Sequence, residues 1–275
     1  EIFETLNARG VRLTSADLIK NFLFQRLLME GEDDSAAYNT YWQTFESPFW
    51  ERLISKGRYV EPRLAIFLGQ FLVSRVAEEI KVEKVFDRFK VYVEEETNLS
   101  TLDVLKQIHA MAKVYEKIIE ASERPEGALS TVERFVYRVN AMDTETVKPV
   151  LLHLLDPSLP AIPGDEIDKA INALESWLVR RAVIRATSKN FNKMFPQLVD
   201  ELIANPRSTA GSFVESFLRQ QIADAKYWPD DSTVRKNLAT LGIYSTLTRS
   251  RLRMILEGIE DEIRNPAGEH AAVPQ

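Results

Sequence analysis

The stretch DEIDKAINALESWLVRRAVIRATS, residues 165–188, decides the fold class. Its apolar residues recur at helical spacing: Leu174, Trp177, Leu178 and Ile184. Asp165 can cap the first turn, so we expect one helix over residues 166–188. The segment before it, residues 156–164, holds three prolines and a glycine, which predicts the clearest break in the chain.

The same helical spacing continues on both sides of this stretch. Near the beginning, Thr14 and Asp17 have the spacing of a capping box in front of a helix from Ala16 to about Gly31. We expect further helices at about residues 38–45, 62–72, 82–95, 101–120, 131–139, 144–155, 191–204, 210–225, 232–239 and 247–264. No alternation of period two is sustained, so a sheet is not needed. The predicted fold is all-α, a multi-helix array of about 10–13 helices in one or two helical subdomains.

Composition excludes several classes of protein. The 275 residues are 45% hydrophobic and carry a net charge of −6, which is too apolar and too weakly charged for a disordered chain. No apolar run approaches the roughly 18 residues of a membrane span, and no signal peptide opens the chain, so we expect a cytoplasmic protein without a membrane partner. The absence of cysteine rules out disulfides and thiolate metal sites.

The most informative charged residues are basic and follow one another at intervals of four. On one continuous helix they would form a ridge about 18 Å long that could follow DNA phosphates. These candidate DNA-binding residues are Arg181, Arg185, Lys189 and Lys193, with Arg180 beside the first of them. Arg181 borders the apolar stripe, so pairing with carboxylates of a neighbouring helix explains the same residues.

Residues typical of catalysis are few. His109 and His153 lie in separate apolar helices, which favours packing over metal binding. Adjacent acidic residues such as Asp33-Asp34 and Asp230-Asp231 are expected to cap helices rather than to hold Mg²⁺. We find no phosphate-binding glycine loop and no nucleophile elbow, so the sequence predicts no catalytic residue, no metal site and no cofactor in this chain.

Three separated stretches of the sequence carry a resemblance to a known family. The first is residues 2–21, through Phe3, Leu6, Asn7, Arg9, Gly10, Leu13, Asp17, Lys20 and Asn21. The second is residues 177–181 with 189–196, and the third is residues 228–231, with Tyr244 and residues 251–257 after them. The first resembles the end of the ParB-like N-terminal domain of the GmrSD-type modification-dependent (type IV) restriction endonucleases of phage defence, and the other two resemble the helical part of that family's C-terminal region.

The resemblance implies a parent hydrolase that uses a nucleoside triphosphate and a divalent metal and cuts modified phage DNA at an HNH-type site. Both catalytic motifs are missing here: the Asp-Gly-Gln-Gln-Arg-like motif is absent, and the tail around His270 has one residue too many for the nuclease motif. The chain also begins at Glu1 without an initiator methionine, so we expect a piece of a longer polypeptide.

The expected organisation follows from this resemblance. Residues 1–31 would end the ParB-like domain, 32–155 would form a helical linker, 165–264 the helical part of the nuclease region, and 265–275 a mobile tail. The chain would couple the sensor to the nuclease, its flanking domains being partners, and would be inert alone. The alternative is a non-catalytic helical scaffold for protein–protein interaction.

Overall fold

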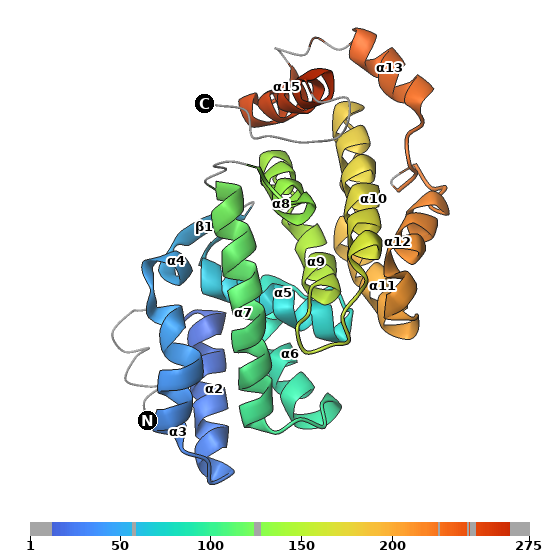
Figure 1. Cartoon of the computed structure of the whole chain (residues 1–275). Coiled ribbons are helices and arrows are strands. Elements are labelled where there is room, and N and C mark those ends of the chain that lie inside the picture. The colour runs from blue at the N-terminus through green and yellow to red at the C-terminus, as the bar shows by residue number, and fades with distance from the viewer. Residues whose placement is uncertain are drawn as a thin grey trace. The chain divides into compact units, whose positions relative to one another are not determined.

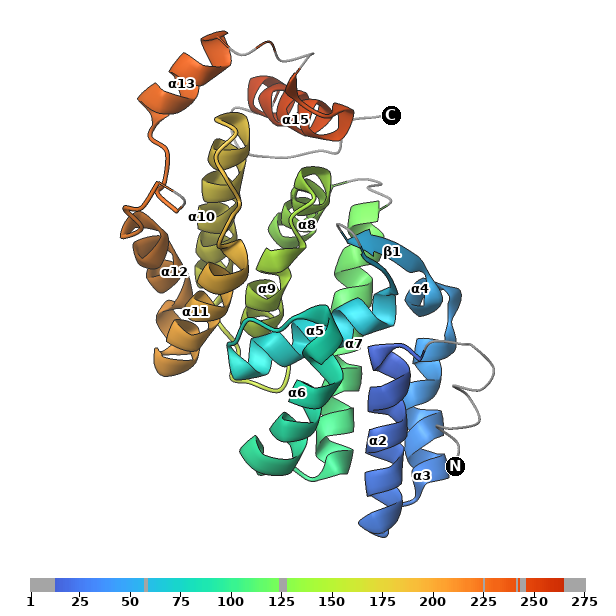
Figure 2. The same ribbon diagram turned by 180° about the vertical axis from the view of Figure 1, so that it is seen from behind.

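The computed structural model describes residues 13–56, 59–123, 128–224, 226–240, 242 and 246–264 (Figures 1 and 2). Within this part the chain forms thirteen α-helices and one two-stranded sheet, so the predicted helical fold is confirmed. None of the described helices combines the length and the apolar content that a bilayer span requires. The helix and turn predicted before residue 11 and the predicted mobile tail lie outside the described residues.

The elements are α2 (Ser15–Met29), α3 (Asp34–Ala37), α4 (Pro48–Glu51), β1 (Leu53–Lys56), β2 (Tyr59–Pro62), α5 (Arg63–Val76), α6 (Val85–Val91), α7 (Thr101–Glu123), α8 (Thr131–Met142), α9 (Lys148–Leu154), α10 (Gly164–Val183), α11 (Phe191–Ala204), α12 (Ala210–Arg219), α13 (Asp231–Thr240) and α15 (Arg249–Arg264). They fall into two compact units, residues 1–113 and 114–275. The functional division expected from the sequence stays a prediction.

The hairpin β1–β2 is absent from the sequence prediction. Its strands pair antiparallel, with Leu53 opposite Pro62 and Ser55 opposite Val60. Each strand has only four residues, too few for a period-two pattern to stand out from its helical surroundings. The hairpin is a small addition to a fold that is otherwise helical, as predicted.

The first unit is built around a cluster of aromatic rings. The ring centroids of Trp42 and Phe45 are 5.0 Å apart, and Trp50 lies 5.2 Å from Phe45 and 5.1 Å from Phe67. All four side chains are at most 2% exposed. Such edge-on and tilted ring pairs add about 0.5–1.5 kcal/mol each to the burial of their apolar area. Helix α2 packs beside this cluster against α5 and α6.

Capping residues define the helix ends of this unit. The predicted capping box of α2 is confirmed: Thr14 Oγ1 accepts from the Asp17 amide, and Asp17 accepts from the Thr14 amide at 2.8 Å. Ser100 likewise caps α7, since its Oγ accepts from the Asp103 amide at 3.1 Å. The cap of α3 is Asp33, as expected for the acidic pair, because its carboxylate accepts from Ala36.

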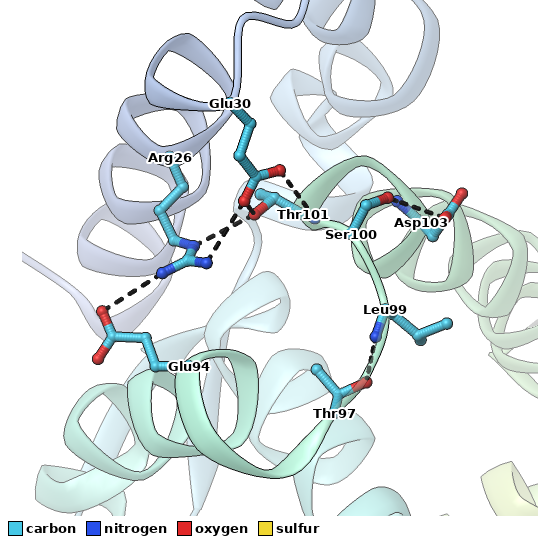
Figure 3. A network of polar contacts seen from close by, with 8 residues as sticks. All are labelled: Arg26, Glu30, Glu94, Thr97, Leu99, Ser100, Thr101 and Asp103. Carbon is cyan, nitrogen blue, oxygen red and sulfur yellow. Dashed lines mark hydrogen bonds and ion pairs between the residues drawn. The ribbon is translucent and has the colours of Figure 1, made fainter.

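An unpredicted polar network joins α2 to the start of α7 (Figure 3). The Glu30 carboxylate accepts from the amide and the hydroxyl of Thr101, at 3.2 and 2.5 Å. Arg26 donates to the same hydroxyl at 3.2 Å and pairs with Glu30 and with Glu94 of the π-helical turn Tyr92–Glu96. A carboxylate at a helix N-terminus is favourable because the amides there lack intrahelical partners.

The second unit is centred on α10, which packs against α8 and α12 (Figure 1). Helix α12 approaches closely because Gly211 has no side chain: a Cβ there would lie 2.2 Å from the carbonyl oxygen of Glu166. The Glu166 carboxylate in turn accepts from the amide and hydroxyl of Ser212, at 2.8 and 3.0 Å. Glycine and a capping carboxylate thus fix the spacing of the two helices.

Helix α15 covers α8 through polar contacts around one buried methionine. Tyr137 donates to Glu257 at 2.7 Å, and burial raises the pKa of Tyr137 to about 12, so the hydroxyl keeps its proton at neutral pH. Arg251 donates to the Met142 carbonyl at the end of α8, at 2.8 Å. Met254 is 3% exposed and fills the space between the two helices.

We predict that Gly211→Ala lowers the free energy of unfolding by about 1–3 kcal/mol, because the added methyl group must push α12 away from α10. Urea denaturation that follows the unfolding of the second unit would measure this loss of stability. Gly164→Ala is the matched control, since a Cβ there meets nothing within 4 Å. Equal stability of both variants would show that the close approach of the helices is not a constraint.

Candidate functional site

The predicted basic ridge does not form, because α10 ends at Val183 and not at residue 188. Its last turn closes as a Schellman motif: the Ala186 amide donates to the Arg181 carbonyl and the Arg185 amide to the Ala182 carbonyl. Arg185 takes the left-handed position at φ 56°, which is usually occupied by glycine. The helix also begins earlier than expected, at Gly164 after Pro163, so Asp165 is not its cap.

The five candidate DNA-binding residues therefore occupy different environments. Arg181 is 1% exposed, and Arg180 is partly buried near the end of α10. Arg185 and Lys189 are exposed in the turns after this helix, while Lys193 is exposed on α11. Arg185 with φ 56° separates Lys189 from α10, and Asn190 with φ 83° is a second left-handed residue between α10 and Lys193.

Arg181 is an internal connector. Its guanidinium donates to the carbonyls of Thr187 and Tyr227, at 2.8 and 2.9 Å. It also lies 5.0 Å from the ring centroid of Trp177 and 5.8 Å from that of Phe191. Burial lowers the pKa of Arg181, but a guanidinium stays charged at neutral pH. The contacts to carbonyls and ring faces offset part of the cost of removing this charge from water.

Three side chains of α10 hold the segment that leads to α13. Trp177 Nε1 donates to the Lys226 carbonyl at 2.9 Å, Arg181 to that of Tyr227, and Arg180 to that of Pro229 at 3.2 Å. Arg180 also pairs with Asp231 at 2.6 Å, while Asp230 caps α13 by accepting from the Thr233 amide. These contacts give α13 its place beside α10, although α13 itself buries no residue.

The family-like stretches of the C-terminal half meet at this place. The rings of Trp177 and Phe191 lie tilted against each other with centroids 5.0 Å apart, which brings residues 177–181 and 189–196 together. The contacts of Arg180 with Pro229 and Asp231 add residues 228–231. Three stretches that are separated in sequence thus form one structural cluster. Tyr244 lies outside the described residues.

A surface hollow of about 390 Å³ opens beside this cluster, between α8, α10 and α13. It is lined by Arg138, Glu175, Ser176, Val179, Arg180, Asp231, Val234 and Arg235. Arg138 pairs with Glu175 and Arg180 with Asp231. Arg235 is exposed and makes no ion pair or side-chain hydrogen bond with another described residue. Three arginines against two carboxylates leave the lining with one net positive charge.

The N-terminal family-like residues are only partly described. Phe3, Leu6, Asn7, Arg9 and Gly10 lie outside the described residues. Asp17 belongs to the capping box of α2, and Lys20 pairs with Glu46 at 2.7 Å. Leu13 is half-buried and Asn21 is exposed. The described residues of this stretch therefore have roles in building and anchoring α2.

The two described histidines, His109 and His153, pack as expected. His109 Nδ1 lies 3.1 Å from the Tyr41 carbonyl and its ring stands edge-on to that of Tyr41, while His153 is 5% exposed in α9. In the described ranges no three His, Asp or Glu side chains are grouped so that they could hold a metal ion. The cluster around Arg181 and the hollow beside it are therefore the best-defined candidate site.

Only part of this site can be predicted from the sequence. Aromatic and basic residues at 177–181 and 189–196 mark it, but Arg138, Glu175 and Arg235 were missed because no local pattern connects them. Comparison of the chain with family models, with curated proteins and with solved structures gives no match.

We predict that Arg181→Ala lowers the free energy of unfolding by about 2–4 kcal/mol, because two charge-assisted hydrogen bonds and the ring contacts are lost. Hydrogen exchange should show α13 losing protection first, since its leading segment is released. Arg185→Ala, an exposed change four residues on, should stay within about 0.5 kcal/mol. Similar effects of the two substitutions would contradict the connecting role of Arg181.

We predict that His109 titrates below 6.5 in the folded protein, because burial and the charge of Lys113 lower its pKa. Its contribution to stability is therefore present above about pH 6.5 and is lost as the pH falls through the folded value. An NMR titration of the ring would measure this, and Lys113→Gln should move the pKa upward. A pKa at or above 6.5 would contradict the described burial.

Proposed function

We propose that this chain is the helical central part of a modification-dependent DNA restriction endonuclease and that its second unit contacts the DNA backbone. The chain itself has a coupling and positioning role, and the parent protein supplies the nucleotide-dependent sensor and the metal-dependent nuclease. The support comes from the three family-like stretches and from the way the last two of them meet the arginine-lined hollow.

The observation that carries the proposal is the hollow with one arginine in its lining, Arg235, that forms no ion pair among the described residues. Arg235 is exposed on α13, and no carboxylate of the described structure pairs with its guanidinium. Arg180 and Asp231 form an ion pair at the rim of the hollow, and the side chain of Asp231 is 66% exposed. Because such an exposed ion pair is weak, Arg180 can exchange the carboxylate for a phosphate. Arginine forks suit this exchange because they bind phosphate oxygens in a bidentate manner.

Such contacts would position the DNA without reading its sequence. The donors and acceptors of the hollow are largely paired with one another, Arg138 with Glu175 and Arg180 with Asp231, and so do not form a set arranged for a base edge. Recognition of the modification is therefore assigned to another part of the parent. The exposed Arg185, Lys189 and Lys193 add positive charge in the same unit and would extend the phosphate contacts.

We predict that the chain binds duplex DNA weakly and that binding weakens steeply with salt, as phosphate contacts require. Fluorescence anisotropy at several salt concentrations would measure the affinity and its salt slope. Arg235→Gln and Lys189→Gln should each weaken binding about 3- to 10-fold for any sequence and reduce the slope by roughly one.

Lys84→Gln is the control, because Lys84 is equally exposed but lies in the first unit and pairs with Asp87. Absence of binding at low salt would refute the proposed DNA contact. An effect of Lys84→Gln as large as that of Arg235→Gln would show that only net charge matters and that the hollow has no special role.

A second candidate function is a scaffold for protein–protein interaction. One specific observation favours it: α15 exposes Leu256, Ile259 and Ile263, of which Ile263 is 74% exposed. An apolar row on one helix is typical of a contact with another helix. This surface is separate from the residues of the hollow, so both functions can coexist.

A further inference from the structure

Helix α15 has two faces of different character. Its inner face packs on α8: Met254 is buried, Glu257 accepts from Tyr137, and Gly258 lies where a Cβ would be 3.6 Å from Arg138. This face of α15 therefore packs inside the second unit. The opposite face points away from α8 (Figures 1 and 2) and is the one that remains to be explained.

The outer face carries a row of four apolar residues, Leu252, Leu256, Ile259 and Ile263, which we call the α15 seam. At about 100° per residue they fall within roughly 60° of arc, almost opposite Met254. Leu256 and Ile259 are each 50% exposed and Ile263 is 74% exposed, while Leu252 is half-buried. Leaving such a row in water forgoes the free energy of burying it.

The spacing of the seam indicates what shape of partner it fits. Its intervals are four, three and four residues, which is the spacing of the contact positions in a two-helix coiled coil. A seam of this width accepts one helix running nearly parallel or antiparallel to it. A broad sheet or an extended peptide would not follow its length.

The charges beside the seam identify the occupant. Arg253 and Glu260 lie seven residues apart on the same flank, one following Leu252 and the other following Ile259. If a second α15 runs antiparallel around a two-fold axis between Leu256 and Ile259, Leu256 meets Ile259 of the second copy and Leu252 meets Ile263. The same arrangement brings each Arg253 opposite Glu260 of the other copy, so the seam is complementary to itself in both shape and charge.

We propose that the α15 seam is the interface between two copies of this chain, paired antiparallel through α15. The proposal does not depend on DNA binding, since it uses none of the residues of the hollow. A contact between one 16-residue helix from each copy belongs to the small interfaces, below about 1,200 Å² in total. The pairing is therefore weak and its extent depends on the protein concentration.

Sedimentation velocity over roughly 5–500 μM tests the pairing. The mass should rise from 31.5 kDa towards twice that value with increasing concentration. Ile259→Glu should weaken self-association at least about tenfold, because it places a charge at the centre of the seam. Ile222→Glu is the control, since Ile222 is 91% exposed elsewhere in the same unit and should leave the association unchanged.

A charge-reversal mixture tests the antiparallel geometry. Arg253→Glu alone and Glu260→Arg alone should each stay monomeric, because like charges then face each other across the two-fold axis. An equimolar mixture of the two variants should associate, because the introduced glutamate of one chain then meets the introduced arginine of the other. In a parallel pair positions 253 and 260 do not face each other, so the mixture would associate no more strongly than either variant alone.

The proposal is overturned if the protein stays monomeric at about 500 μM, the upper end of the range in which a small interface should form. It is also overturned if the Ile259→Glu variant associates as strongly as the unsubstituted chain, or if the mixture of the two charge-reversed variants stays monomeric. Circular dichroism of each variant at low concentration checks that α15 remains helical. This check is needed because each charge reversal removes one ion pair within α15. Arg253→Glu removes the pair Arg253–Glu257, and Glu260→Arg removes the pair Arg264–Glu260, each with an N···O distance of 2.5 Å.

Discussion

Burial of one guanidinium organises the second unit. Arg181 is 1% exposed, and it satisfies its charge with two backbone carbonyls that no regular element uses, those of Thr187 and Tyr227. The first of these closes the turn after α10, and the second holds the segment that leads to α13. Since an unpaired buried charge is costly, both segments must stay in place for Arg181 to stay inside.

The consequences of this burial reach the surface. With Arg181 turned inward, its neighbour Arg180 lies at the rim, where it pairs with Asp231 and lines the hollow together with Arg138 and Arg235. Elsewhere, the buried Met254 of α15 and the contact of Tyr137 on α8 with Glu257 fix α15 and leave its apolar seam outward. The two surfaces that we connect with function are thus both set by the packing around α8 and α10.

Sequence reasoning succeeded where the signal is local. The capping box at Thr14 and helix 191–204 are found where they were expected, because side-chain caps and apolar spacing act within a few residues. It failed for the end of α10, since a Schellman motif with an arginine in the left-handed position carries no glycine to mark it. The predicted basic ridge does not form for the same reason, and the short hairpin β1–β2 was not predicted.

The sequence by itself determined that this protein is helical, where most helices begin, and that a proline-rich break precedes α10. Only the tertiary structure decided that Arg181 is internal while Arg185 is exposed, and that Arg138, Arg180 and Arg235 line one hollow. The physical reason is range: helix formation depends on neighbours within one or two turns. The fate of a charge depends instead on partners such as the Tyr227 carbonyl, which lies 46 residues from Arg181.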